Sequence, residues 1–303
     1  MARIVSQGTE SVQFEVGGLR CLAVGDGTLT YAPPVFPPPP VLLFASAPRD
    51  ELRQVLVAAG LEPGQWLEWT SSYTCLLVDS GEHRVLVDTG AGALAPSTGR
   101  LLRNLAALGI TPEEIDTVVL THGHPDHIGG NTDAEGKVVF SKARFVMWED
   151  EWDFWNSGRA EHELDEHVRP VLLESARKNL PPIRARLDLV DREEEIVPGI
   201  RALAAPGHTP GHMALEVASQ GERLLCVSDA VLHPLHLEHP EWCAAVDLGR
   251  EEVVATRRKL LNMAATKSTL VFAFHFPFPG LGHVVCKDEA WEWQAVKAPP
   301  MPR

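Results

Sequence analysis

The stretch His122-Gly123-His124-Pro125-Asp126-His127 comes one residue after an apolar run, Thr117-Val118-Val119-Leu120. It brings three imidazoles and one carboxylate together, and burying such groups without partners costs roughly 2–7 kcal/mol for each neutral polar group. A bound metal ion removes this penalty, because imidazole nitrogens and carboxylate oxygens are metal ligands. The stretch therefore predicts a metal site at the end of a buried strand. A solvated histidine-rich loop is the weaker alternative.

The spacing of these ligands favours two metal ions over one. The apolar run is short and β-branched, so we expect a buried strand. His122 and His124 lie two positions apart in its extended continuation and point the same way, because Pro125 disfavours helical torsions at His124. The next two ligands, Asp126 and His127, follow in a turn. Two pairs of ligands thus leave one loop in different directions.

An apolar run that ends near a polar, metal-ligand side chain recurs along the chain. Active-site groups are commonly carried by loops at the ends of the strands of a rigid sheet, so we expect these side chains to gather at one edge. The runs and the side chains that follow them are Val85–Val87 with Asp88, Ile200–Ala204 with His208, Leu224–Val227 with Asp229, and Leu270–Phe274 with His275.

The order of these motifs resembles that of the metallo-beta-lactamase superfamily. H-x-H-x-D-H comes first, a G-H-T-x-G-H-like turn second, and then an Asp and a His, over a region from about residue 70 to residue 286. The resemblance implies an α/β fold, the αββα sandwich of two mixed β-sheets with helices on the outer faces. No linker interrupts the chain, so we expect residues 1–303 to form a single hydrolase domain. Residues 1–65 would be an N-terminal arm and possible lid.

The resemblance also implies a dinuclear metal centre. A hydroxide held between two ions about 3.5–4 Å apart would attack the substrate, with Asp126 and Asp229 as the catalytic carboxylates and Asp126 also carrying a proton to the leaving group. The ligands are nitrogen and oxygen only, which suits zinc first and also manganese, iron or cobalt. By resemblance, one ion would be held by His122, His124 and His208, the other by Asp126, His127 and His275, with Asp229 as the bridge.

Other residues are expected to surround the metals. Asp88 and His212 are predicted to orient ligand side chains without coordinating an ion. The aromatic run 148–155 is either core packing at helical spacing or one wall of an apolar pocket. The candidates for contact with substrate are His233, Trp69, Trp152 and Trp155.

Within the superfamily, the chain looks most like the lactonase and organophosphate-hydrolase branch. Lactonases of this branch often carry a tyrosine three positions after the bridging Asp, where this chain has Leu232. The chain has only two tyrosines, Tyr31 and Tyr73, so that hydroxyl is either missing or comes from elsewhere. His124 stands where oxygen-reducing diiron members have Glu, which favours hydrolysis.

A lactone or carboxylic ester therefore ranks first as substrate, an organophosphate triester second, and a thioester of the glyoxalase II kind third. Two hypotheses of a different kind of function stay open. The protein could be a mononuclear-iron oxidative enzyme, which metal analysis would reveal, or a metal-binding module without catalysis, which the complete ligand set disfavours.

The net charge, the apolar runs and the cysteines limit the substrates, the partners and the location that we expect. The net charge of −14 predicts a small, uncharged or apolar substrate and no nucleic acid, which would need clustered Lys and Arg. No apolar run is long enough for a membrane helix. The five scattered cysteines are typical of reduced thiols in a cytoplasmic protein. A homodimer is left open.

Periodicity predicts helices over residues 48–59, 99–108, 160–179 and 249–264. Paired strands are expected at 12–16 with 20–24 and at 74–78 with 84–88. Thr111-Pro112-Glu113-Glu114 has the order of a capping box.

Overall fold

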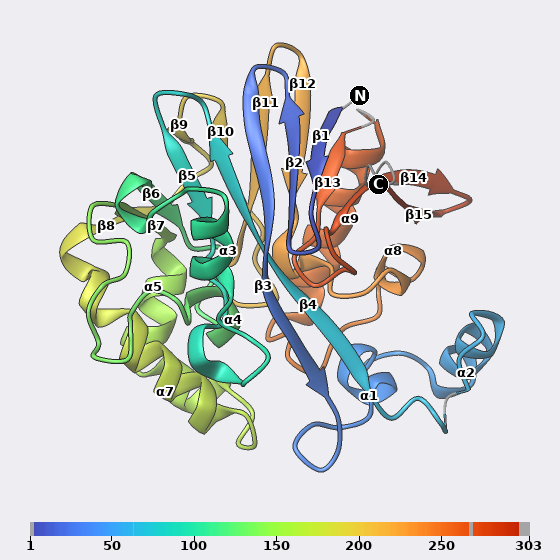
Figure 1. The fold of residues 1–303 in the computed structure, drawn as a ribbon. Helices are drawn as coiled ribbons and strands as arrows, with labels where there is room; N and C mark the ends of the chain where they lie inside the picture. The colour runs from blue at the N-terminus through green and yellow to red at the C-terminus, as the bar shows by residue number, and fades with distance from the viewer. Residues whose placement is uncertain (1–2, 63, 267–268, 297–303) are drawn as a thin grey trace.

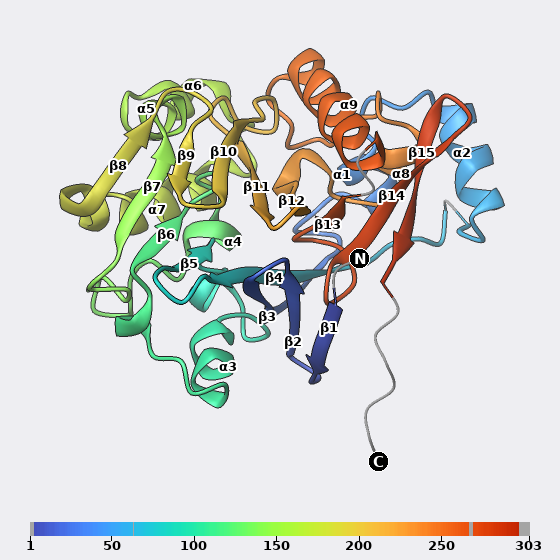
Figure 2. The same cartoon turned by 90° about the horizontal axis from the view of Figure 1, so that it is seen from above.

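The structure, a computed structural model, describes residues 3–62, 64–266 and 269–296. Two mixed β-sheets lie face to face, with helices on both outer sides (Figures 1 and 2). The predicted αββα sandwich is confirmed. The two ends of the predicted domain, residues 1–2 and 297–303, lie outside the described residues.

The first sheet has eight strands that follow one another in chain order. Pairing is antiparallel from β1 to β5 and parallel from β5 to β8. Its strands are β1 (Arg3–Gln7), β2 (Ser11–Val16), β3 (Leu19–Tyr31), β4 (Trp69–Asp79), β5 (Arg84–Val87), β6 (Thr117–Val119), β7 (Arg144–Trp148) and β8 (Leu187–Val190).

The second sheet has seven strands, in the order β15-β14-β13-β12-β11-β10-β9. Among the described residues of this sheet, only β12 and β13 pair in parallel; the other neighbours are antiparallel. Its strands are β9 (Glu195–Val197), β10 (Ile200–Ala204), β11 (Met213–Ser219), β12 (Glu222–Cys226), β13 (Leu270–Phe272), β14 (Leu281–Lys287) and β15 (Ala290–Ala295).

Three apolar layers hold the sandwich together. Side chains such as Phe14 of the first sheet and Leu215 of the second pack between the sheets. Helices α3 to α7 cover the outer face of the first sheet, and Leu260 and Leu261 of α9 cover the second. The helices are α1 (Pro39–Leu43), α2 (Arg49–Ala58), α3 (Leu101–Ala107), α4 (Pro125–Ile128), α5 (Glu149–Asn156), α6 (Arg159–Glu163), α7 (Arg169–Asn179), α8 (Leu235–Glu238) and α9 (Arg250–Thr266).

The structure differs from the sequence-based expectations in three segments. The helix expected over 160–179 is divided into α6 and α7, because Pro170 lacks the N–H that a continuous helix needs and instead lies in the first turn of α7. Residues 125–128 form the one-turn helix α4 in place of a turn. Residues 3–31, expected in the N-terminal arm, are strands β1 to β3 of the first sheet.

The part of the N-terminal region that lies outside the sheets is therefore the connection between β3 and β4, residues 32–68, which we call the arm. Leu43, Phe44 and Leu56 of the arm pack against Leu235 and Trp242, beside α8. Among the residues that the structure describes, no helix combines the length and the apolar character needed to span a bilayer.

Candidate metal centre

The seven side chains predicted from the sequence as metal ligands lie together at one edge of the sandwich. His122, His124, Asp126 and His127 follow β6 of the first sheet, whereas His208, Asp229 and His275 come from loops of the second. All seven are buried. Their ligand atoms form two groups, each with all atoms within 4.8 Å of one another: His122, His124, His208 and Asp229 in one, and Asp126, His127 and His275 in the other.

The first group brings three imidazole nitrogens together beside Asp229. Nδ1 of His124 lies 3.0 Å from Nε2 of His122 and 2.9 Å from Nε2 of His208. Loop geometry brings these rings together, because His124 keeps an extended backbone, with φ −72° and ψ 154°, before Pro125 opens α4.

The second group combines nitrogen and oxygen donors. Nε2 of His275 lies 3.5 Å from Oδ2 of Asp126, and Nε2 of His127 lies 3.8 Å from the same oxygen. This set of donors is one that zinc, manganese, iron and cobalt all accept.

Asp229 faces both groups at once. Its Oδ2 lies 3.4 Å from Nε2 of His208 and 3.0 Å from Nε2 of His275, and its Oδ1 lies 3.2 Å from Nε2 of His127. One carboxylate thus lies between two clusters of nitrogen donors. This is the arrangement expected of a group that bridges two cations.

The chemistry of the donors fits metal ions. Within the described part of the chain, the buried Nε2 of His127 makes no hydrogen bond; Oδ1 of Asp229 lies 3.2 Å from it. Nδ1 of the same ring lies 2.7 Å from Oδ2 of Asp88. Asp88 therefore holds the proton on Nδ1 and leaves the Nε2 lone pair directed into the cluster. A bound cation would neutralise lone pairs and carboxylates gathered in a buried space such as this.

Three side chains fix the outer nitrogens of the ligand rings. Asp88 accepts from His127, as the sequence suggested. Oδ1 of Asp247 lies 2.8 Å from Nδ1 of His208, and Oγ of Ser71 lies 2.8 Å from Nδ1 of His275. Sequence reasoning missed Asp247 and Ser71, because neither belongs to a recognisable motif or lies near its partner in the chain.

Both ring nitrogens of His212 are hydrogen-bonded to backbone groups. Its Nδ1 lies 2.9 Å from the carbonyl oxygen of Ala205, and its Nε2 accepts the backbone N–H of Asp229 at 3.1 Å. Burial and the neighbouring His208 lower the pKa of His212 to about 3. A neutral His212 with both nitrogens occupied can orient Asp229 but has no lone pair left for an ion.

Glu151, on α5, connects the two ligand loops. Its Oε1 accepts the backbone N–H of Gly123 at 2.8 Å and the indole N–H of Trp155 at 2.7 Å. Its Oε2 accepts the hydroxyl of Thr209 at 2.6 Å and the backbone N–H of Gly211 at 3.1 Å. Burial raises the pKa of this carboxyl, against the effect of these donors. Sequence reasoning missed Glu151, because it lies in an acidic run typical of an exposed helix.

The close approach of α5 explains both glycines. A Cβ at Gly123 would lie 2.2 Å from Nε1 of Trp155, and one at Gly211 would lie 2.0 Å from the backbone nitrogen of Glu151. Only glycine leaves room for α5 at these two points.

Three of the four side chains predicted to contact substrate lie beside the candidate ligands or against the arm. The Trp155 ring lies 5.9 Å from that of His124, and the Trp69 ring lies 6.1 Å from that of His275. His233 contacts Phe44 and Trp66 of the arm, and burial lowers the pKa of His233 to about 4.

Trp152, the fourth candidate, is placed differently. It is half-buried, and the guanidinium of Arg184 stacks on its ring at 5.3 Å. No contact between Trp152 and the ligand side chains occurs among the described residues, so its position favours core packing.

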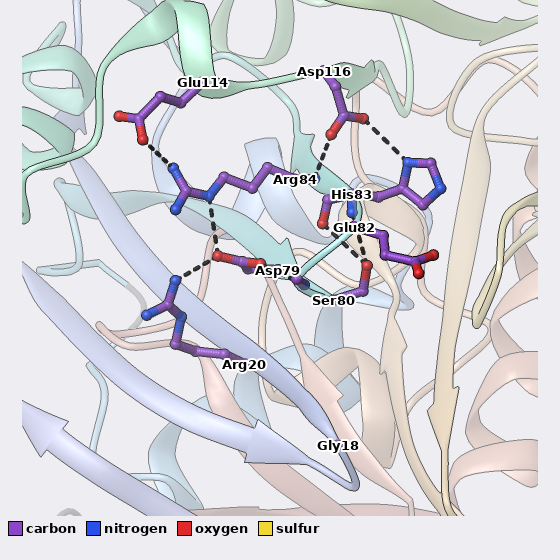
Figure 3. A pocket seen from close by; sticks show the side chains of 10 residues that line it. Gly18, Arg20, Asp79, Ser80, Glu82, His83, Arg84, Glu114 and Asp116 are labelled. Atoms are coloured by element: carbon purple, nitrogen blue, oxygen red, sulfur yellow. Dashed lines mark hydrogen bonds and ion pairs between the residues drawn. The ribbon is translucent and has the colours of Figure 1, made fainter.

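A separate surface pocket lies between the start of β3 and the turn that joins β4 to β5 (Figure 3). Several of its charges are paired with one another: Asp79 binds Arg20 and Arg84, and Arg84 also binds Glu114 at 2.6 Å. Since β5 and β6 run from this end toward the ligand loops, the pocket is remote from the metal ligands.

Comparison with known proteins agrees with this geometry. Residues 69–275 match the model of the metallo-beta-lactamase superfamily. An N-acyl homoserine lactonase of Bacillus sp. is 27% identical over 259 residues, which cover 77% of this chain and 92% of the relative.

Two solved structures share the whole architecture. AidC, described as a dizinc quorum-quenching lactonase in complex with a product, has a TM-score of 0.82 at 26% identity, over 95% of this chain and 98% of its own. The hydrolase AbOPH has a TM-score of 0.83 at 27% identity, over 97% of this chain and 100% of its own. The predicted family is confirmed: the chain belongs to the metallo-beta-lactamase superfamily.

Proposed function

We propose that this protein is a dinuclear metal-dependent hydrolase that opens a lactone or cleaves a carboxylic ester. The observation that carries the proposal is the position of Asp229 between two clusters of donors, each suited to one ion. Zinc is the first choice for both ions, because the related AidC is described as dizinc and the donor set suits it.

When bound, two divalent ions would supply a hydroxide nucleophile at neutral pH and positive charge for the reacting oxygen. The chain's own groups hold the reacting atoms in place and move the proton. Asp88, Asp247 and Ser71 fix three of the ligand imidazoles by their outer nitrogens.

The proton balance assigns a role to Asp126. Hydrolysis adds the oxygen of water to the carbonyl carbon, breaks the ring C–O bond and leaves an alkoxide that must gain a proton. Asp126, at 8% exposure, is the least buried of the seven ligand residues. Its carboxylate can accept the proton released by the nucleophile and deliver it to the alkoxide oxygen.

The walls of the site favour a small substrate without charge. Trp155 lies beside His124, and Trp69 lies beside His275, so apolar surface flanks both donor clusters. The net charge of −14 repels polyanions. An N-acyl homoserine lactone, the substrate class named for the bacterial relatives, meets both conditions. A phosphotriester also meets them and ranks second.

The test is a comparison of kcat/KM on the zinc-loaded enzyme. N-acyl homoserine lactones with acyl chains of increasing length are compared with paraoxon, S-lactoylglutathione and bis(p-nitrophenyl) phosphate. We expect the lactones to be the best substrates, with kcat/KM rising by up to about 4-fold for each methylene buried in the pocket.

His122→Ala should abolish turnover, whereas His162→Ala, which removes an exposed imidazole on α6, should leave it unchanged. The proposal fails if the phosphodiester is the best substrate. It also fails if the active enzyme holds one iron per chain and no second ion.

A further inference from the structure

One face of the β3–β4 pair is directed at the second donor cluster. This pair extends beyond the rest of the first sheet toward α1 (Figure 1). Alternate residues of a strand share a face, and on β4 three of them contact the same ligand ring. Trp69 and Tyr73 lie with ring centroids 6.1 and 5.5 Å from that of His275, and Ser71 bonds its Nδ1.

The same face carries both tyrosines of the chain. On β3, Tyr31 is paired with Trp69, and the rings stack at 5.1 Å with an interplanar angle of 26°. The phenol oxygens of Tyr31 and Tyr73 are 2.6 Å apart, so the two hydroxyls form a hydrogen bond directly beside the ring of His275.

This pair has one donor more than it uses. Two hydroxyls carry two hydrogens, and only one hydrogen can lie between the two oxygens. Neither phenol oxygen has another hydrogen-bond partner among the residues that the structure describes. Tyr73 is completely buried, whereas Tyr31 is only partly buried. Either hydroxyl can donate this bond. In the arrangement where Tyr73, the more buried of the two, donates to Tyr31, the hydrogen of Tyr31 is free to reach a ligand.

The bond between the two hydroxyls also makes the free hydrogen a better donor. A hydroxyl that accepts one hydrogen bond also donates a stronger one, because the bonds polarise each other.

We propose that Tyr31, oriented by Tyr73, donates a hydrogen bond to the carbonyl oxygen of the substrate and to the oxyanion that this oxygen becomes. The inference rests on the proposed hydrolysis of an ester or lactone. Tyr31 is then a catalytic residue, since it contacts the reacting atoms, and Tyr73 is a positioning residue that acts through Tyr31. The chain thus has a phenol donor at the site although position 232 is a leucine.

The hydrogen bond from Tyr31 would act during addition of hydroxide to the carbonyl carbon. When hydroxide oxygen adds to the carbonyl carbon, the electron pair of the C=O bond moves to the carbonyl oxygen, which becomes negative. A donor aimed at this oxygen binds it more tightly in the transition state than in the substrate. Loss of the donor should therefore lower kcat more than it raises KM.

The test uses Tyr31→Phe, Tyr73→Phe and the double variant, all zinc-loaded. Each is assayed on whichever of the lactone, phosphotriester and thioester the wild-type enzyme hydrolyses best. We expect Tyr31→Phe to lower kcat by about 10–100-fold, with KM changed by less than about 3-fold. Tyr73→Phe should cost about 3–10-fold, and the double variant should lose no more than Tyr31→Phe alone.

A matched control lies on the opposite face of the same strands. The hydroxyls of Thr30 and Thr70 form an exposed pair at 2.9 Å, so Thr30→Val removes a similar hydrogen bond without touching the site. Its activity should stay within about 2-fold of the wild type. A second readout is binding of the ring-opened product, N-hexanoyl homoserine, by calorimetry. Tyr31→Phe should weaken this binding by about 2–10-fold while zinc content and unfolding midpoint stay unchanged.

Two results overturn the role of Tyr31 alone: full kcat in Tyr31→Phe, or additive losses from Tyr31→Phe and Tyr73→Phe accompanied by lower zinc content. A wild-type enzyme that hydrolyses none of the three substrates refutes the proposed function, and the role of Tyr31 with it.

Discussion

Asp247→Asn should weaken zinc binding without removing any metal ligand. The side chain of Asp247 is fully buried. One oxygen lies 2.8 Å from Nδ1 of His208, and the other accepts the backbone N–H of Ala244 at 2.8 Å. Asparagine has a single acceptor oxygen, so it can satisfy only one of these two donors. Its NH₂ group must face the other.

Both orientations of the amide are unfavourable. If the NH₂ faces Ala244, a buried backbone N–H loses its partner, which costs about 1–3 kcal/mol. If it faces His208, the ring must move its proton from Nδ1 to Nε2, and Nε2 is the nitrogen directed at the cluster. The substitution also removes the charge 3.8 Å from the buried Arg257. We expect the free energy of unfolding to fall by about 2–5 kcal/mol.

Zinc affinity is the decisive measurement. Competition with a chelating dye should show binding weakened by about 10–100-fold, the usual cost of losing a partner of a ligand histidine. Asp165→Asn is the matched control, because Oδ1 of Asp165 bonds Nδ1 of His167 at 3.0 Å on the exposed surface. Wild-type zinc affinity in Asp247→Asn would refute the reasoning. So would an equal loss in Asp165→Asn.

Elemental analysis should show two ions per chain, and chelation should lower Tm, since bound ions stabilise only the folded state; one ion, unchanged by added zinc, would contradict the dinuclear assignment. Asp229→Ala should cost far more activity than His212→Ala, because Asp229 faces both donor clusters, whereas His212 contacts only backbone groups, the carbonyl oxygen of Ala205 and the N–H of Asp229. Equal losses in folded, metal-loaded variants would mean that His212 is misassigned. Glu151→Ala should lower the free energy of unfolding by at least about 4 kcal/mol, since four buried donors lose their acceptor at about 1–3 kcal/mol each; urea unfolding beside Glu149→Ala, an exposed change on the same helix, measures it.

The fold and the close approach of the seven candidate ligands could be predicted, because both depend on short local patterns in the sequence. Short apolar runs identify strands, and the candidate ligands follow these runs within a few positions. The capping box at Thr111–Glu114 is likewise local, and both of its hydrogen bonds are present. The break between α6 and α7 was missed, because the helical periodicity was given more weight than Pro170.

The supporting groups could not be predicted, because they depend on contacts between distant parts of the chain. Asp247 meets His208 across 39 positions, and Ser71 meets His275 across 204. Nothing near Glu151 in the sequence indicates that its carboxylate receives donors from two loops. The roles of the seven ligands, a single 1–303 domain, a cytoplasmic location and a homodimer remain predictions.

The ligand loops come from both halves of the sandwich, four ligands from the loop after β6 and three from loops of the second sheet. Ions bound there would connect the two sheets at one edge of the sandwich, much as a covalent cross-link would. Chelation should then loosen the molecule unevenly. In hydrogen exchange, we expect amides in the loops at 120–130, 205–212 and 226–230 to lose protection first, while strands at the opposite edge, around Val16 and Ser219, keep theirs. Uniform loss of protection over both edges would indicate that the sheets separate as a whole.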